Sequence, residues 1–424
     1  MKYLTFVIAL LIVLLGNFIL AAQTSVTIKG KIIDQQTNVP LELATISLKG
    51  KSIGTVSNSD GEFELTVSNN YVNDTVAFSM LGYAGYQNKV SQLLPNNFLT
   101  IKLTFTPVIL KELVVKADAV SPNEIFRKAY ENIKLTFLQE PYALKSFYRQ
   151  LNTENDKAVL LIEAAVDIYD RKYSLNKSFN LEEKIIVNQV RASSSHFKNT
   201  NKNYFEESNT LTGLLLFNFT KYNNKYVMER TNFTLDSMEY LNDKLVYVIS
   251  SVSSGSQLTN RFTFHIDAER FAFLKIKNES IAHEGKFLQN FDVPGSPDQS
   301  KVLKLIASSQ TYQFKEYKKR MYLEQATSFS KGQIINSSTN DVEWTVTDEN
   351  SLVVYEVLTG NLKTPKENNM DKGKNLKHLN KKYNPDFWTN ADLIKLTPLT
   401  RKQRNELEST ESLQKQFAKE GNIK

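Results

Sequence analysis

Cysteine is absent from the 424 residues of this sequence. Its absence excludes disulfide bonds, thiolate metal sites and a cysteine nucleophile, and we expect no lipoprotein-type lipid anchor. Histidine is scarce, and none of His196, His265, His283 and His378 lies in an HxxE or HExxH pattern of the kind that zinc hydrolases use. The sequence also lacks a GxSxG nucleophile elbow and a P-loop. We therefore predict a protein that is not an enzyme and carries no cofactor or metal.

A strong excess of charge is also missing. The net charge of +7 is small for a chain of this length, and nucleic-acid binders usually concentrate basic residues on one face. We expect no nucleic-acid partner. The Lys-rich stretch Asp371–Tyr383 is the one candidate for a phosphate or lipid-headgroup contact. A solvated linker explains that stretch better, although peripheral contact with a membrane stays open.

Long apolar runs are confined to the start of the sequence. Residues 1–22 combine one lysine, an apolar run and a small pair, Ala21 and Ala22, which is typical of a secretory signal peptide. We predict cleavage near Ala22–Gln23, with an uncleaved anchor as the alternative. No later run approaches the roughly 20 residues of a spanning helix. The expected location is the periplasm or the periplasmic face of the outer membrane.

Residues 30–105 alternate between apolar and polar side chains in short runs. Ala44, Ile46 and Leu48 share one strand face. Asp60 and Gly61 form a tight turn, because glycine accepts the positive φ that such turns need. Short strands at this spacing, without helical periodicity between them, predict a small antiparallel β-sandwich.

The same region resembles the carboxypeptidase-regulatory-like domain, a transthyretin-like β-sandwich of envelope proteins. The matching segments are Gly30–Asp34, Pro40–Ala44, Asn58–Phe63, Phe78–Tyr83 and Leu110–Val115. The resemblance implies a module without catalytic residues of its own. It is also similar to the N-terminal extension of TonB-dependent receptors, but the roughly 300 residues that follow are too few for a plug and a 22-stranded barrel. Transport is therefore not implied.

We divide the chain into a signal peptide at 1–22, the sandwich at 23–117, a β-rich domain at 118–360, and a polar linker and C-terminal tail at 361–424. The β-rich domain begins with a predicted helix at 122–140. Ser121 caps this helix, Pro122 occupies its first turn, and Glu124 completes a capping box. Phe387 and Trp388 are expected to fix the tail to the body of the protein.

The second domain is dominated by strand patterns. Residues 158–170 fit a strand, with a buried helix as the alternative. Residues 211–219 fit a helix or loop over a cavity mouth or, as the favoured interpretation, a core strand. Further hairpins are predicted with turns at Asn242–Asp243 and near 318–320, and residues 341–359 are expected to form two strands. The predicted fold is mainly β: the sandwich, then a larger antiparallel β-rich α+β domain.

This pattern loosely resembles the half-barrel of periplasmic lipoprotein carriers, in which a curved sheet holds acyl chains against a helix. Phe262, Phe264 and Ile266 fall on one strand face and are the candidate ligand-binding residues. An open groove there would bind an acyl chain, since burial contributes about 0.8 kcal/mol per CH₂. A filled core explains the same aromatic residues, and is favoured.

The predicted function is that of a non-enzymatic exported envelope protein, a binding or docking module of unknown ligand, whose larger domain binds a partner protein or an apolar ligand. The first alternative is a periplasmic carrier of an apolar ligand. The second is a metal-dependent hydrolase, for which His265, Asp267 and Glu269 on one strand face are the only candidates. A charged strand edge explains these three residues equally well.

Overall fold

The computed structural model describes most of the chain after residue 24. The described residues are 25–106, 120–174, 181–193, 210–221, 231–241, 244–292, 301–370, 372–379, 382–389 and 397–420. The predicted signal peptide, the segment Leu110–Val115 and the predicted turn Asn242–Asp243 lie outside them.

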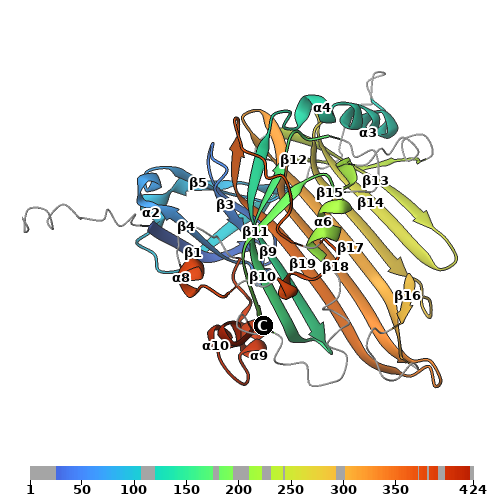
Figure 1. The fold of residues 1–424 in the computed structure, drawn as a ribbon. Helices are drawn as coiled ribbons and strands as arrows, with labels where there is room; N and C mark the ends of the chain where they lie inside the picture. Colours follow the sequence, from blue (N-terminus) through green and yellow to red (C-terminus); the bar gives the residue numbers. More distant parts are fainter. Residues whose placement is uncertain are drawn as a thin grey trace, which may run out of the picture.

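The N-terminal unit is a sandwich of two four-stranded sheets (Figure 1). One sheet contains, in spatial order, β4 (Glu62–Ser68), β1 (Ser25–Asp34), β8 (Leu99–Phe105) and β6 (Tyr83–Ala84). The other contains β3 (Gly54–Val56), β2 (Thr45–Leu48), β5 (Thr75–Ser79) and β7 (Tyr86–Lys89). Two short helices, η1 (Asn69–Tyr71) and α2 (Val90–Leu93), connect strands.

The predicted alternation is confirmed in the sandwich core. Ile46, Phe63 and Phe78 are almost completely buried between the two sheets. Gly61 has a φ of +75°, and a Cβ there would lie 2.4 Å from the carbonyl oxygen of Ile32. A side chain would therefore strain the backbone and clash with β1, which explains the predicted turn glycine.

The second unit is built on one antiparallel sheet of eleven strands. Its spatial order is β11 (Lys184–Ser193), β10 (Lys157–Asp170), β9 (Tyr142–Glu154), β19 (Val342–Thr359), β18 (Arg320–Asn336), β17 (Lys301–Tyr317), β15 (Phe273–Ala282), β14 (Leu258–Asp267), β13 (Lys244–Ser254) and β12 (Thr234–Leu241), with β16 (Gln289–Asp292) paired to β17. The sheet remains open, with β11 and β12 at its two edges.

The strand 158–170 and the hairpin near 318–320 are confirmed. Lys318 and Lys319 both have positive φ between β17 and β18, as a two-residue hairpin turn requires. The prediction of two strands over 341–359 is wrong, because β19 runs unbroken through Asp348–Asn350. These turn-like residues stay in a strand because their side chains bond across it: Asn152 Nδ2 donates to Asp348 Oδ1 at 2.7 Å.

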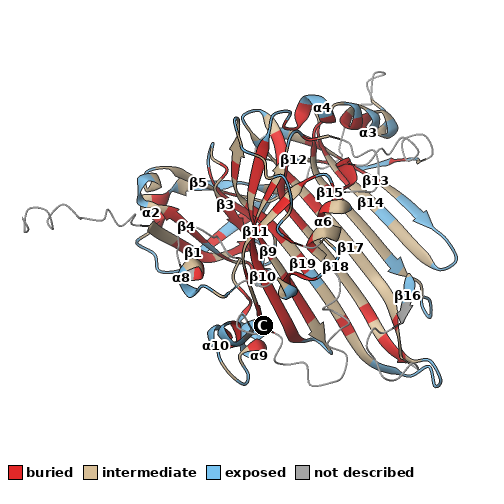
Figure 2. Cartoon of the chain, viewed as in Figure 1, coloured by how far each residue is buried: buried red, intermediate tan, exposed pale blue. Residues whose placement is uncertain are grey.

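Different elements pack against the two faces of this sheet. The face that carries Tyr148 and Tyr312 packs against helices, and we call it the helix face. The opposite face carries Glu324, which meets the sandwich, and we call it the sandwich face. Burial is almost continuous along β9 and β10, while the far end of β13 is exposed (Figure 2).

The predicted helix 122–140 is shorter than expected. α3 (Pro122–Glu131) begins as predicted, since the Ser121 side chain accepts the N–H of Glu124 at 3.2 Å. The reciprocal half of the capping box is not formed, because the carboxylate of Glu124 pairs with Arg127. After α4 (Ile133–Thr136), Phe137 turns extended and forms a parallel bridge with Met321. Pairing with the sheet thus ends the helix before Pro141.

The interpretation of residues 211–219 as a core strand is wrong. They form α6 (Thr210–Leu216) followed by η2 (Phe219–Lys221). Leu211, Leu214 and Leu215 have the i, i+3, i+4 spacing of one helix face, and all three are buried against the sheet. Figure 1 shows α6 lying across the large sheet, and Tyr312 Oη donates to the Leu214 carbonyl at 3.0 Å.

The tail packs against the large sheet instead of extending into solvent. It contains η3 (Leu376–His378), α8 (Pro385–Thr389), α9 (Arg401–Leu407) and α10 (Leu413–Glu420). Asn375 and Leu376 are buried, so the solvated-linker interpretation of this stretch is wrong at these two residues. Asn368 and Asn369 accept the N–H groups of Ile185 and Val187 at 2.7 Å each, which caps the edge strand β11. No helix in the described part is long and apolar enough to cross a membrane.

Candidate functional site: the cleft between the two units

The sandwich and the large sheet enclose a cleft of about 920 Å³, which we call the inter-domain cleft. Its sandwich wall comes from β2, β5 and residues 79–87. Its other wall comes from β12, β15, β17 and β18, on the sandwich face. A volume of this size lies at the upper end of the range of small-molecule sites, and it accommodates an extended chain equally well.

The two walls are held in place by hydrogen bonds across the junction. Thr45 Oγ1 donates to Glu324 Oε2 at 3.4 Å and accepts from Gln313 Nε2 at 3.3 Å. On β19, the N–H of Val357 donates to Ser52 Oγ at 3.0 Å. These contacts join buried strands of both units, so the cleft is a fixed feature of the fold.

The charged groups of the inter-domain cleft are mostly paired. Glu316 accepts from Lys244 at 3.1 Å and from Arg270 at 2.8 Å. Lys315 lies 3.3 Å from Glu324. Lys275 differs, because it has no ion-pair partner among the described residues, and burial together with the neighbouring Lys277 lowers the pKa of its ammonium group. Lys275 therefore offers a cation that can receive a carboxylate, and Lys49, which also lines the cleft, donates to Gln87 at 3.3 Å.

His265 lies behind this cation on the sandwich face of β14, paired in register with Lys275. Its Nδ1 has no hydrogen-bond partner in the described structure. Burial, and then the positive charge of Lys275, lower the pKa of His265 to about 3. The imidazole is neutral at physiological pH, so it cannot act as a cation there.

We expect His265 to make the protein sensitive to acid. The unfolded chain binds a proton at this residue below pH 6.5, whereas the folded protein binds it only near pH 3. The unfolded state therefore holds more protons in this window, and stability falls as the pH drops, by at most about 1.4 kcal/mol per pH unit. Urea unfolding between pH 7 and 4 should show a flatter pH dependence for His265→Gln than for His283→Gln. Equal slopes would contradict the assignment.

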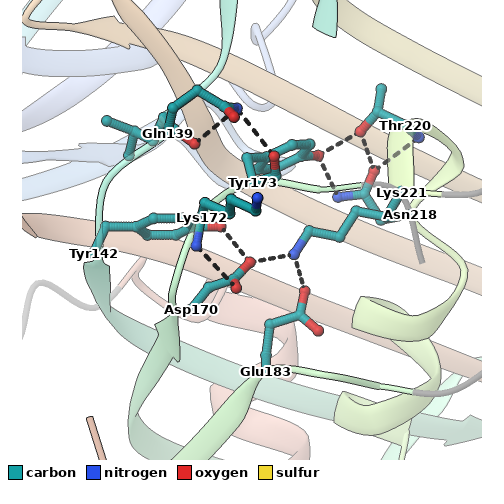
Figure 3. Close-up of polar contacts among 10 residues, drawn as sticks. Gln139, Tyr142, Asp170, Lys172, Tyr173, Glu183, Asn218, Thr220 and Lys221 are labelled. Atoms are coloured by element: carbon teal, nitrogen blue, oxygen red, sulfur yellow. Dashed lines mark hydrogen bonds and ion pairs between the residues drawn. The ribbon is translucent and has the colours of Figure 1, made fainter. Parts of the chain in front are cut away.

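A second group of polar residues surrounds Lys221 inside the large sheet unit (Figure 3). Lys221 Nζ donates to Asp170 Oδ2 at 2.7 Å and to Glu183. Tyr142 Oη also donates to Asp170, at 3.0 Å. Although burial alone would lower it, the pKa of Lys221 is raised by the two carboxylates. Lys221 and Glu183 are buried and Asp170 is largely buried, and among the described residues only one oxygen of Glu183 lacks a partner. This cluster ties η2 to β10 and is structural.

A third group lies on the helix face beneath α6. Tyr148 Oη donates to Asn350 at 2.7 Å and contacts Thr210 of α6. Burial raises the pKa of Asp348, which accepts hydrogen bonds from Asn152 and Asn350. The amides satisfy this carboxylate, and the network joins α6 to two strands.

The three predicted ligand-binding residues lie on the helix face. Phe264 and Ile266 are 1% and 0% exposed. Phe264 contacts the rings of Phe126 and Phe233, at centroid distances of 4.9 and 5.8 Å. Phe262 is half-buried and lies at the border of this aromatic cluster. Their ligand-binding role stays a prediction, and two of them offer no free surface in this packing.

The residues of the hydrolase alternative do not converge. In the pairing of β14 with β15 the extra residue is Leu274 of β15, so His265 and Asp267 stay on one face of β14. Asp267 instead accepts the N–H groups of Glu269 and Arg270, both at 2.9 Å, in the turn that follows. Within the described ranges, no three His, Asp or Glu side chains are grouped as metal ligands.

Sequence reasoning missed the inter-domain cleft. The residues that line it are far apart in the sequence, from Glu42 to Glu324. Strand alternation predicts which residues share a face of a strand, but it does not predict which faces pack against each other. Lys275 carried one weak signal, since a lysine alternates there with apolar residues of a strand. That signal is too common to identify a site.

Comparison with known proteins supports the N-terminal assignment alone. Residues 28–115 match the CarboxypepD_reg-like domain, a regulatory-like domain and not a catalytic one. No curated protein matches the chain. Three solved structures align weakly: lipovitellin (8% identity, 56% of this chain, 27% of that chain, TM-score 0.27), a DUF1329 family protein from Desulfovibrio piger (9%, 54%, 91%, 0.21) and a porin of Rh. blastica (9%, 50%, 99%, 0.10). TM-scores this low assign neither fold nor function to the large sheet.

Proposed function

We propose that this chain is a non-enzymatic, exported envelope protein that docks an extended segment of a partner protein in the inter-domain cleft. The observation that carries the proposal is the cleft itself, which two units build jointly and hold open. The expected location is the periplasm or the periplasmic face of the outer membrane. The signal-like residues 1–22 and the CarboxypepD_reg-like domain support it.

An extended polypeptide fits the chemistry of the cleft. β7 is the edge strand of its sheet, and its Tyr86 and Gln87 line the cleft. An edge strand has free backbone groups that an added strand can pair with. Tyr86 and Tyr240 are 38% and 46% exposed and supply apolar contact from opposite walls, and Lys275 can receive an acidic side chain.

The two alternatives have less support. An apolar-ligand carrier needs free surface at Phe264 and Ile266, and both side chains are packed. A metal-dependent hydrolase needs converging ligands, and Asp267 is bonded within its own turn.

Site-specific crosslinking in intact cells tests the docking function. A photoreactive residue at Tyr86 or at Tyr240 should yield adducts with the same partner protein, because the two positions face one cleft. The matched control is Phe98, which is 54% exposed and does not line the cleft. Adducts at Phe98 alone, or different partners at Tyr86 and Tyr240, would refute the proposal.

Lys275→Met separates docking from folding. The substitution keeps most of the length of the side chain and removes a half-buried charge that has no ion-pair partner among the described residues, so the Tm should stay constant or rise. Adduct yield at Tyr86 should fall severalfold if Lys275 binds a carboxylate of the partner. An unchanged yield would remove Lys275 from the proposed site.

A further inference from the structure

A second cavity, of about 390 Å³, lies along the same junction beside the C-terminal tail. We call it the tail pocket. The sandwich contributes residues 56–59, the large sheet contributes β9, β18 and β19, and the tail contributes Thr397, Pro398 and Gln403. It shares only Glu42 and Leu43 with the inter-domain cleft.

Strand register places polar groups in rows on the floor of this pocket. Thr327 of β18 is opposite Ser351 of β19, which is opposite Arg149 of β9. In the next row Phe329 is opposite Glu349. All these residues line the pocket, so hydroxyls, a guanidinium, a carboxylate and one aromatic ring share one surface.

Gln325 lies at the end of this floor and has unusual surroundings. It is 2% exposed, yet neither its Nε2 nor its Oε1 has a hydrogen-bond partner among the residues that the structure describes. The buried hydroxyl of Thr397, on the tail side of the pocket, also lacks a partner within the described part of the chain. Unpaired buried polar groups are rare and unfavourable. Two that line one cavity indicate a ligand that donates and accepts hydrogen bonds there.

The other side chains that line the tail pocket indicate the chemical class of this ligand. Arg149 directs Nε and Nη2 to Glu163, at 2.9 and 2.7 Å, which leaves Nη1 as a donor. Glu42 and Glu349 are acceptors, and Phe329 is half-buried and supplies an apolar face. We propose that the tail pocket is a saccharide-binding site. Sugar hydroxyls both donate and accept, and the C–H face of a sugar ring packs on an aromatic side chain.

A polypeptide fits this pocket less well than it fits the inter-domain cleft. β9, β19 and β18 are neighbours inside the sheet, so their backbone groups are paired with one another. An added strand therefore finds no free edge on the floor, and recognition depends on side chains alone.

Oligosaccharide binding by the full-length protein tests the inference. An array of immobilised oligosaccharides selects the strongest binder, and calorimetry with that oligosaccharide then measures Kd. We expect Gln325→Met to weaken binding at least tenfold without lowering the Tm, because it replaces an unpaired amide with an apolar side chain of similar size. Phe329→Ala should also weaken binding.

The matched control is Gln333→Met, on the same face of β18 but outside the pocket, and its Kd should equal that of the wild type. No binding to the oligosaccharide array, an equal loss of affinity in Gln333→Met, or binding to a parallel peptide array alone would overturn the inference. Crosslinking from Tyr86 should be unchanged in Gln325→Met, so this test and the docking test can fail separately.

Discussion

Replacing Glu163 with glutamine is expected to lower the free energy of unfolding by about 3–5 kcal/mol. Glu163 is 1% exposed and lies between two arginines, 2.7 Å from Arg149 Nη2 and 2.6 Å from Arg191 Nη2. Burial alone would raise the pKa of this carboxyl, but Arg191 and Arg149 outweigh burial and lower it. The variant leaves two largely buried guanidinium groups without a countercharge. Urea unfolding at pH 7 measures the effect.

Glu356→Gln is the matched control for this prediction. Glu356 of β19 pairs with Lys145 of β9 at 3.1 Å, but its side chain is 39% exposed. Exposed pairs contribute little, so a loss below about 1 kcal/mol is expected. A loss as small for Glu163→Gln would show that the buried group contributes no more than an exposed ion pair.

The same substitution should also loosen the tail. Arg191 lies 4.2 Å from the ring centre of Trp388 and 4.7 Å from that of Phe417, so Glu163 fixes the side chain on which the tail packs. The pKa of Glu163 is depressed in the folded protein, so its stabilising effect is lost as the pH falls through that pKa. Limited proteolysis should cleave Glu163→Gln near the C-terminus faster than the wild type.

Replacing Lys221 with methionine is expected to have an effect of similar size. Asp170 and Glu183 then lose their shared cation, and neither carboxylate has access to enough water to be stable when ionised. We expect a loss of about 3–5 kcal/mol, with η2 released from β10. Hydrogen exchange should increase first in residues 210–221.

Removing all three charges together tests the cause of that loss. Lys221→Met combined with Asp170→Asn and Glu183→Gln should regain most of the stability, since no unpaired buried charge remains. Glu182→Gln is the control, because Glu182 is the exposed neighbour of Glu183. If the triple variant is as unstable as Lys221→Met, lost packing and not unpaired charge explains the effect.

Local features of the fold were readable from the sequence. The turn at Gly61, the cap at Ser121 and the hairpin at Lys318–Lys319 each follow from a few adjacent residues. The sandwich was identified by several short motifs in order, and residues 28–115 match the family that those motifs indicated. The strand at 158–170 was predicted from its almost continuous apolar run, with a buried helix as the alternative.

Errors arose where a distant partner changed the local preference. Asp348–Asn350 resemble a turn, but amides of β9 hold them in one long strand. The apolar residues 211–216 fit a buried strand and a buried helix equally well. They lie over a face of the large sheet and not beside one of its edge strands, so they form a helix. No strand was predicted over β11, and a bulge opposite Ala165 interrupts the alternation of its residues.

The sequence by itself determined the mainly β class, the sandwich and the absence of cysteine chemistry, because each depends on residue type and on spacing of a few positions. The tertiary structure alone decided which faces meet. It buried Phe264 and Ile266 in a filled core. Among the described residues, it left Lys275 without an ion-pair partner in the inter-domain cleft and Gln325 without a hydrogen bond from its side chain in the tail pocket. Burial and hydrogen bonding of a side chain depend on residues that are far apart in the chain, so strand periodicity does not predict them.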